Sequence, residues 1–180
     1  ESTRLLFKEA VDELEGVSIL INCAATASQS MCNFADLTDD LWGTTQEINV
    51  QAPLILSQEF ARQGISGSII NISSIEAKQP AKGHTHYSVS KSALEALTKA
   101  SATELGSLGI RVNGIAPGLI ERDGIKVGWP EGVSRWEDNA PLGRLVDPED
   151  ISSAAVFLAS DESSFMTGAD LLLDGGYTAW

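Results

Sequence analysis

Short apolar runs that alternate with helical patterns are the feature that most constrains how this chain can fold. Strands that alternate with helices favour βαβ units and a parallel sheet. The sequence therefore predicts an α/β fold with a doubly wound parallel sheet, as one domain over residues 1–180. The runs with the length and composition of buried strands are Ile19–Asn22, Ser68–Ile72, Arg111–Ala116 and Asp170–Leu173.

Helix signals separate these expected strands. Thr38, followed by two aspartates, is typical of an N-cap with an acidic first turn. Asp147 and Pro148 have the residue types of an N-cap and a first helical position. Helices are therefore expected over Glu1–Glu15, over Thr38–Arg62, from near His86 to Leu105, and from Asp147 onward.

Ser74, Tyr87 and Lys91 form the candidate catalytic group. Tyr87 and Lys91 are four residues apart in Y-S-V-S-K, which places both side chains on one face of a helix. A phenol alone keeps its proton until about pH 10, and a fixed ammonium beside it lowers that pKa. Ser74 follows the end of an expected strand, so its hydroxyl can converge with the other two groups. Such a set suits proton exchange with a carbonyl or alcohol oxygen.

Five segments in a fixed order resemble the short-chain dehydrogenase/reductase family. Besides the Ser74, Tyr87 and Lys91 group, they are N-C-A-A at Asn22–Ala25, I-N-V around Asn49, R-V-N-G-I-A-P-G at Arg111–Gly118 and L-L-L-D-G-G-Y at Leu171–Tyr177. The resemblance extends from about residue 17 to the C-terminus. It implies a Rossmann-like oxidoreductase that transfers a hydride between NAD or NADP and a secondary alcohol or ketone.

The resemblance also implies a role for each catalytic position. Tyr87 would be the acid/base, and Ser74 would donate a hydrogen bond to the substrate oxygen. Lys91 would lower the pKa of Tyr87 and hold the nicotinamide ribose. Asn49 would hold a local helix kink and a water of the proton relay, with a solvent-facing asparagine as the alternative.

The cofactor would lie along the ends of the strands. By resemblance, Asn22 and Ala24 would face its adenosine side, whereas Asn113 would be structural. Two residues depart from the family: Ala25 replaces a glycine, and Arg122 replaces a usual threonine. Arg122 would either pair with a cofactor phosphate or face solvent. The residues expected to line the nicotinamide pocket are Ile72, Pro117, Gly118 and Ile120.

The family's first strand and its Gly-rich phosphate-binding turn have no counterpart in these 180 residues. We expect the N-terminal third to belong to the molecule although it lies outside this sequence. Without a neighbouring strand, Ser18–Asn22 would be an exposed apolar edge. The alternative function is a catalytically inactive truncated domain that acts only in association, because the backbone amides that hold a pyrophosphate would be missing.

The segment Gly118–Leu145 is the longest stretch expected to be irregular. It contains Trp129, Pro130 and Trp136 among many charges. A loop of this length in a compact domain is usually functional or disordered. The family has its substrate loop at this place, so we expect a substrate loop here. The alternative is a mobile surface loop that is only held in place by its tryptophans.

Two histidines, His84 and His86, flank the catalytic motif. They would either line a substrate pocket or cap the following helix, and no role is assigned to them. No acidic residue in the sequence evidently orients either one, and no G-x-S-x-G motif is present. A serine hydrolase is therefore disfavoured.

Composition excludes several kinds of partner. The formal net charge of −13 argues against nucleic acid and against anionic membranes. Cys23 and Cys32 lack the spacing of a metal site, so no metal is expected, and cytosolic thiols are the simplest interpretation. No apolar run reaches the length of a membrane span. The family resemblance implies a cytoplasmic homotetramer or dimer with a small-molecule alcohol or ketone as substrate.

Overall fold

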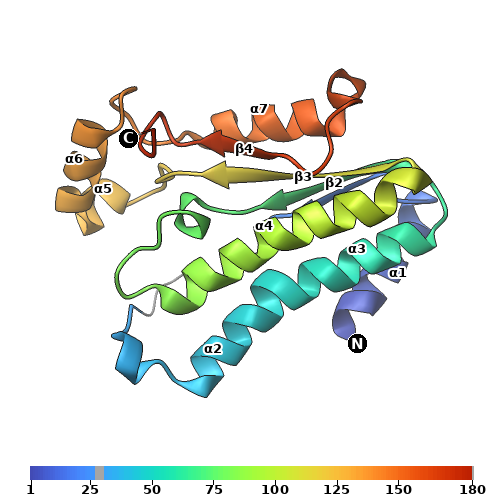
Figure 1. Ribbon diagram of the computed structural model, residues 1–180, viewed down its shortest axis with the longest axis horizontal. Coiled ribbons are helices and arrows are strands. Elements are labelled where there is room, and N and C mark those ends of the chain that lie inside the picture. Colours follow the sequence, from blue (N-terminus) through green and yellow to red (C-terminus); the bar gives the residue numbers. More distant parts are fainter. Residues whose placement is uncertain (27–30, 180) are drawn as a thin grey trace.

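A four-stranded parallel sheet in the order β1-β2-β3-β4 forms the centre of the computed structural model, which describes residues 1–26 and 31–179 (Figure 1). All four expected strands are confirmed, and β1 and β4 match at both ends. The α/β fold with a parallel sheet is likewise confirmed. The strands are β1 (Ile19–Asn22), β2 (Gly67–Ile72), β3 (Ile110–Pro117) and β4 (Asp170–Leu173).

The helices begin where the sequence signals place them. Thr38 accepts a hydrogen bond from the Leu41 N–H at 3.2 Å, as an N-cap does. Asp147 and Asp150 form a reciprocal capping box. The helices are α1 (Ser2–Leu14), α2 (Asp39–Gln46), α3 (Ala52–Arg62), α4 (Thr85–Leu105), α5 (Ile125–Gly128), α6 (Pro130–Asn139) and α7 (Pro148–Ala159).

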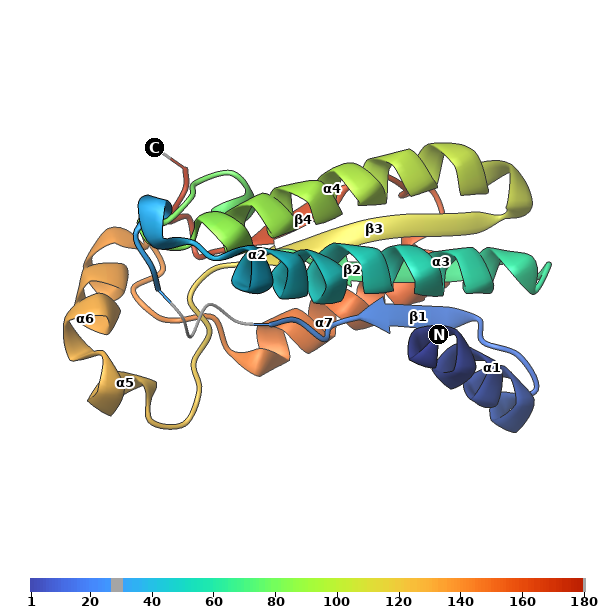
Figure 2. The same cartoon turned by 90° about the horizontal axis from the view of Figure 1, so that it is seen from below.

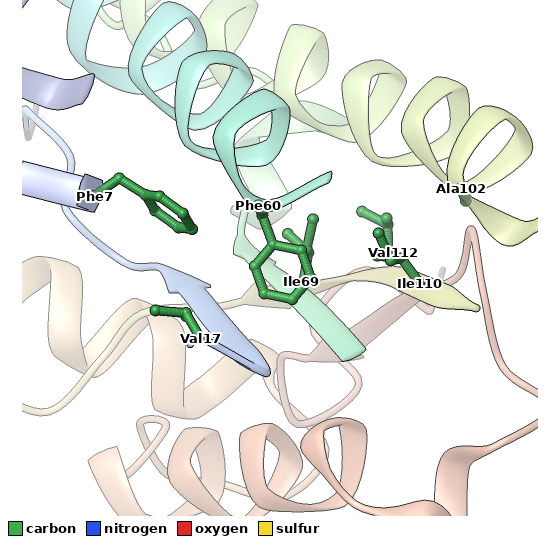
Figure 3. Packing of buried hydrophobic residues seen from close by; sticks show 7 residues of the cluster. All are labelled: Phe7, Val17, Phe60, Ile69, Ala102, Ile110 and Val112. Atoms are coloured by element: carbon green, nitrogen blue, oxygen red, sulfur yellow. The ribbon is translucent and has the colours of Figure 1, made fainter. Parts of the chain in front are cut away.

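Helices cover both faces of the sheet. On one face, Phe60 of α3 and Ile69 of β2 lie in an apolar cluster that also contains residues of α1, α4 and β3 (Figure 3). The next residue of β2, Ile70, points to the other face and packs with Leu158 of α7. Figure 2 shows α2 and α3 running beside α4 on the first face.

The last crossover differs in hand from those before it. The connections β1 to β2, β2 to β3 and β3 to β4 all step the same way across the sheet. The helices α3 and α4 lie on one face, whereas α7 lies on the other. The β3–α7–β4 unit therefore has the opposite hand, and it departs from the right-handed rule for parallel crossovers.

One edge of the described sheet exposes apolar side chains. Ile19 and Ile21 of β1 are 47% and 46% exposed. The sequence-based expectation of an exposed apolar edge at Ser18–Asn22 is thus confirmed. Within the described residues, no helix combines the length and apolar character needed to cross a membrane.

The prediction that Gly118–Leu145 is irregular is wrong, because α5 and α6 lie within it. Val133 and Trp136 of α6 are buried and pack against Ile75, next to the Ser74 turn. The Trp136 ring also stacks on Tyr177, with ring centroids 4.0 Å apart. The segment is therefore a packed helical cover at the carboxyl end of the sheet.

Candidate active site

The predicted catalytic residues come together at the carboxyl ends of the strands. Ser74 directly follows β2 and caps a short 3₁₀ turn, Ile75–Ala77. Tyr87 and Lys91 lie in the first turns of α4, whose start faces this turn (Figure 1). In open α/β sheets, ligands bind in the crevice at these strand ends. The fold therefore brings a hydroxyl, a phenol and an ammonium to the usual place for a ligand.

Lys91 is a buried cation with few protein partners. Its side chain is 3% exposed, and its Nζ donates to the Ile72 carbonyl oxygen at 2.8 Å. Burial lowers the pKa of Lys91 to about 8, and the nearby charge of Cys23 opposes this shift. Because an ammonium has three donors, Lys91 keeps hydrogen-bonding capacity beyond its bond to Ile72.

The expected lowering of the Tyr87 pKa is wrong for this structure. Burial raises the pKa of Tyr87, a hydrogen bond with Ser74 opposes the shift, and the Glu76 carboxylate adds to it. The physical reason lies in the position of Lys91. Its Nζ lies over the Tyr87 ring, 5.5 Å from the centroid, and donates to the Ile72 carbonyl. Desolvation of the phenol therefore outweighs the benefit of the neighbouring cation.

Ser74 is fixed as an acceptor on one side. Its Oγ accepts from the Glu76 N–H at 3.1 Å, which leaves the hydroxyl proton available for the hydrogen bond with Tyr87 or with a substrate oxygen. The competing residue Ser73 is buried, and its Oγ lies 3.4 Å from both the Lys91 carbonyl and the Glu95 carboxylate. This arrangement supports the choice of Ser74 over Ser73.

Asn49 is buried at a break in the helix. It is 1% exposed and lies in a π-helical segment, Glu47–Gln51, that joins α2 to α3. Its side chain accepts from the Thr26 N–H at 2.9 Å and donates to the Ser90 Oγ at 2.9 Å. The expected local kink is present, and the solvent-facing alternative is wrong.

A chain of polar side chains connects β1, β2 and α4. Asn22 donates to Asn71 at 2.7 Å, and Asn71 donates to Thr98 at 2.8 Å. The Asn22 side chain is therefore used inside the protein, with its Oδ1 buried and unpartnered. Ala24 is exposed just past β1.

The residues expected beside the nicotinamide lie at the ends of β2 and β3. Pro117 ends β3 and is buried, and Gly118 follows it. A Cβ on Gly118 would meet the Trp136 ring at 2.4 Å, so this glycine leaves room for α6. Ile120 forms a bridge with Val146. Asn113 bonds the Met166 carbonyl and the Ala169 amide, a structural role.

Arg122 is exposed at the border of a hollow of about 550 Å³. The hollow also touches Lys126, which pairs with Glu121 at 2.7 Å. A second hollow of about 250 Å³ lies between Arg144 and Leu173. Neither is lined by Ser74, Tyr87 or Lys91, so the candidate site rests on the geometry of its side chains.

A cluster of polar side chains that the sequence did not predict lies next to Tyr87. The Glu76 carboxylate contacts His84 Nδ1 at 3.0 Å, and Ser88 donates to it at 2.9 Å. The statement that no acidic residue orients His84 is therefore wrong. Only the folding of the connection between β2 and α4 brings residues 76 and 84 together, so no local pattern in the sequence indicates this contact. Ser88 bonds to the acid and not to the histidine, so the order of a hydrolase triad is not formed.

The two cysteines are not joined by a disulfide. Cys23 is exposed, Cys32 is partly buried, and both are free thiols. Across residues 1–26 and 31–179, no three His, Cys, Asp or Glu side chains are grouped as metal ligands would be.

A family model described as "Enoyl-(Acyl carrier protein) reductase" matches residues 1–178. Human "Dehydrogenase/reductase SDR family member 4" is 35% identical over 182 residues, which cover 98% of this chain and 65% of that protein. The chain thus spans slightly less than two thirds of that relative.

Solved structures show the same likeness. A 4-hydroxyisoleucine dehydrogenase complexed with NADH is 34% identical with a TM-score of 0.89, covering 99% of this chain and 77% of that one. A gluconate 5-dehydrogenase from Burkholderia cenocepacia, in complex with NADP and tartrate, is 28% identical with a TM-score of 0.91. The match covers 99% of this chain and 71% of that chain.

Proposed function

The chain belongs to the short-chain dehydrogenase/reductase family, and from this premise we propose that it carries the site for NAD(P)-dependent hydride transfer between a secondary alcohol and a ketone. The observation that carries the proposal is the buried Lys91 ammonium over the Tyr87 ring, beside Ser74. Burial of a cation costs free energy unless charges or hydrogen bonds offset it, and ionisable groups with perturbed pKa values cluster at functional sites.

The residues present fit a nicotinamide cofactor. Lys91 has donors left for ribose hydroxyls, and it lies at the strand ends where dinucleotides bind in such sheets. Ile72, Pro117 and Gly118 would lie along the nicotinamide, and Ala24 toward the adenosine side. When bound, NAD or NADP supplies or accepts the hydride.

The protein's own residues would manage the substrate oxygen and its proton. Ser74, whose side chain hydrogen-bonds with Tyr87, would donate its hydroxyl proton to the substrate oxygen and stabilise the charge that develops there. Tyr87, whose pKa is raised by burial, keeps its proton near neutral pH and is suited to protonate a ketone oxygen in reduction. In oxidation the same phenol oxygen would take up the alcohol proton. Asn49 would hold the neighbouring backbone in place through Thr26 and Ser90.

Three broader expectations belong to the same proposal. The segment Gly118–Leu145, which packs over the Ser74 turn through Trp136 and Ile75, would form the substrate side of the site. The outer surfaces of α2–α3 and α4 would join copies of the chain as a homotetramer or dimer. The protein would act in the cytoplasm.

Replacement of Tyr87 by phenylalanine tests the proposal in the intact protein. Loss of the proton donor is expected to lower kcat by about 10²–10⁴-fold, while NADH or NADPH affinity, measured by tryptophan fluorescence, stays nearly unchanged. Tyr177→Phe is the matched control, because it removes the same hydroxyl and keeps the ring that stacks on Trp136. Near-normal turnover by Tyr87→Phe would exclude Tyr87 from the mechanism.

A further inference from the structure

Beside the proposed catalytic group lies a second polar group that the mechanism does not use. It consists of Glu76, His84 and Ser88, and we call it the Glu76 group. The His84 Nδ1 lies 3.0 Å and 3.2 Å from the two carboxylate oxygens of Glu76, and the Ser88 Oγ donates to one of them at 2.9 Å. Two elements, the turn after β2 and the start of α4, thus hold this carboxylate in one position.

The Glu76 group is directly joined to the catalytic residues. The Glu76 N–H donates to the Ser74 Oγ at 3.1 Å. Tyr87 and Lys91 share one face of α4, and His84 is the residue directly before this helix, three positions before Tyr87. The Ser88 hydroxyl that donates to the Glu76 carboxylate belongs to the residue next to Tyr87, so the carboxylate lies at the same end of α4 as the phenol. Burial is the main cause that raises the pKa of Tyr87, and the Glu76 charge adds to it. A substrate held by Ser74 and Tyr87 would therefore extend past this carboxylate.

The carboxylate has unused hydrogen-bonding capacity. A carboxylate offers about four lone-pair positions, and His84 and Ser88 supply only two donors. The Glu76 side chain is 19% exposed, so a ligand can reach it. The neighbouring His86 is 2% exposed, and its buried Nδ1 has no hydrogen-bond partner.

We propose that the Glu76 carboxylate is a substrate subsite that accepts a hydrogen bond from a hydroxyl next to the reacting carbon. The substrate class is then a vicinal diol or polyol and its hydroxyketone, and not a simple alcohol. This inference rests on the proposed function, because it takes Ser74 and Tyr87 as the place of the reacting oxygen. A carboxylate on the substrate at the same position would be repelled by like charge.

The expected size of the preference for a vicinal diol follows from the strength of a hydrogen bond to the Glu76 carboxylate. A hydrogen bond to a charged group is roughly twice as strong as a neutral one. The Glu76 carboxylate keeps His84 and Ser88 when the substrate lacks a hydroxyl, so it is never left without partners. We therefore expect kcat/KM for a vicinal diol to exceed that for a simple alcohol by about 10- to 100-fold. This ratio is below the one reached when loss of a substrate hydroxyl leaves a polar group of the site unpaired.

Two probes that differ by one hydroxyl test the subsite: 2,3-butanediol and 2-butanol. The ratio of their kcat/KM values, with NAD⁺ or NADP⁺, is expected to favour the diol in the wild-type protein and to fall by about 5- to 10-fold in Glu76→Gln. Glu76→Ala is expected to abolish the preference. Glu104→Gln, an exposed carboxylate near the far end of α4, is the control and should leave the ratio unchanged.

Ligand-observed NMR of the two probes supplies a readout that does not need turnover. Glu76→Gln keeps the shape of the side chain, and a thermal melt confirms that each variant is folded. Turnover with the same diol preference in the wild type and in both Glu76 variants would overturn the subsite and leave the proposed function standing. Diol binding that depends on Glu76, without oxidation of either probe, would support the subsite and count against the proposed function. Neither binding nor turnover would overturn both.

Discussion

The two ends of the sheet are built from different kinds of residue. At the amino ends of the strands, the core is an apolar cluster in which Phe60, Ile69 and Val112 are 0% exposed (Figure 3). At the carboxyl ends, α4 buries a histidine, two serines and Lys91. Burial of the first kind releases free energy, whereas burial of the second kind costs free energy unless hydrogen bonds offset it. The comparison teaches that the amino end serves stability alone, whereas the carboxyl end combines the polar catalytic group with a second apolar cluster around Trp136.

The first prediction removes the largest fully buried side chain, Phe60, from the apolar cluster at the amino end. Phe60→Ala is expected to lower the free energy of unfolding by about 3–5 kcal/mol, because it leaves a cavity between α3 and β2. Urea denaturation measures the change. Phe165, which is fully exposed, is the matched control, and Phe165→Ala should stay within about 0.5 kcal/mol. Equal losses in the two variants would mean that the apolar end is not the main source of stability.

The second prediction concerns the free-energy cost of burying the Lys91 ammonium at the carboxyl end of the sheet. The pKa of Lys91 is lowered from 10.5 to about 8, so the folded protein is penalised whenever this lysine is charged. The penalty is fully present below pH 8, and it is lost as the pH rises toward 10.5, because the unfolded chain then binds more protons than the folded one.

The substitution Lys91→Met removes this dependence of stability on pH. The variant's stability relative to the wild type is expected to fall by about 2–3 kcal/mol between pH 7 and pH 10. The Ile72 carbonyl loses its partner in the variant at every pH, so that loss cancels from the comparison. Urea midpoints at the two pH values measure the effect, and a constant difference would show that the buried ammonium carries no penalty.

The smallest expected effect lies between the two ends, at Asp170. Burial raises the pKa of this carboxyl, with Lys78 and Lys99 opposing the shift, and its Oδ1 is unpartnered. Because the folded pKa lies above the ordinary 3.8, the folded state loses stability as the pH rises past that value.

Asp170→Asn is therefore expected to stabilise the protein by up to about 1 kcal/mol at pH 7, and the gain should vanish near pH 3.5. Thermal melts at the two pH values measure it. Asp12→Asn, an exposed change on α1, should show no such pH dependence. A loss of stability in Asp170→Asn at pH 7 would contradict the assignment of a buried carboxylate penalty.

Much of the fold could be predicted because its signals are local. The runs at β1 and β4 are apolar and bounded by polar residues, so their ends matched. The helix α6 was missed although Pro130 suits a first helical position and Val133, Trp136 and Ala140 have helical spacing. The apolar face of this segment has only three buried side chains among many charged residues, so its helical pattern was weak.

The candidate site was predictable only in part, for a similar reason. Tyr87 and Lys91 are one turn apart on the same helix, so spacing alone places them together. The pair of Glu76 and His84 depends on how the connection from β2 to α4 folds back, which no local pattern shows. The direction of the Tyr87 pKa shift also depended on burial, which spacing does not report.

The Asn22–Asn71–Thr98 chain has a consequence for strand alignment. In the described sheet, Leu20 and Ile21 lie opposite Ile69 and Ile70. If β1 slid by one residue toward the carboxyl end of β2, Ile19 and Leu20 would lie opposite Ile69 and Ile70, so part of the aliphatic pairing would remain. The slide would, however, separate Asn22 from Asn71 and leave buried amides unpaired, at a cost of about 1–3 kcal/mol for each group. The amide chain therefore helps to fix the register of β1 on β2, in addition to the apolar pattern, because a one-residue slip would also turn every side chain of the strand to the opposite face.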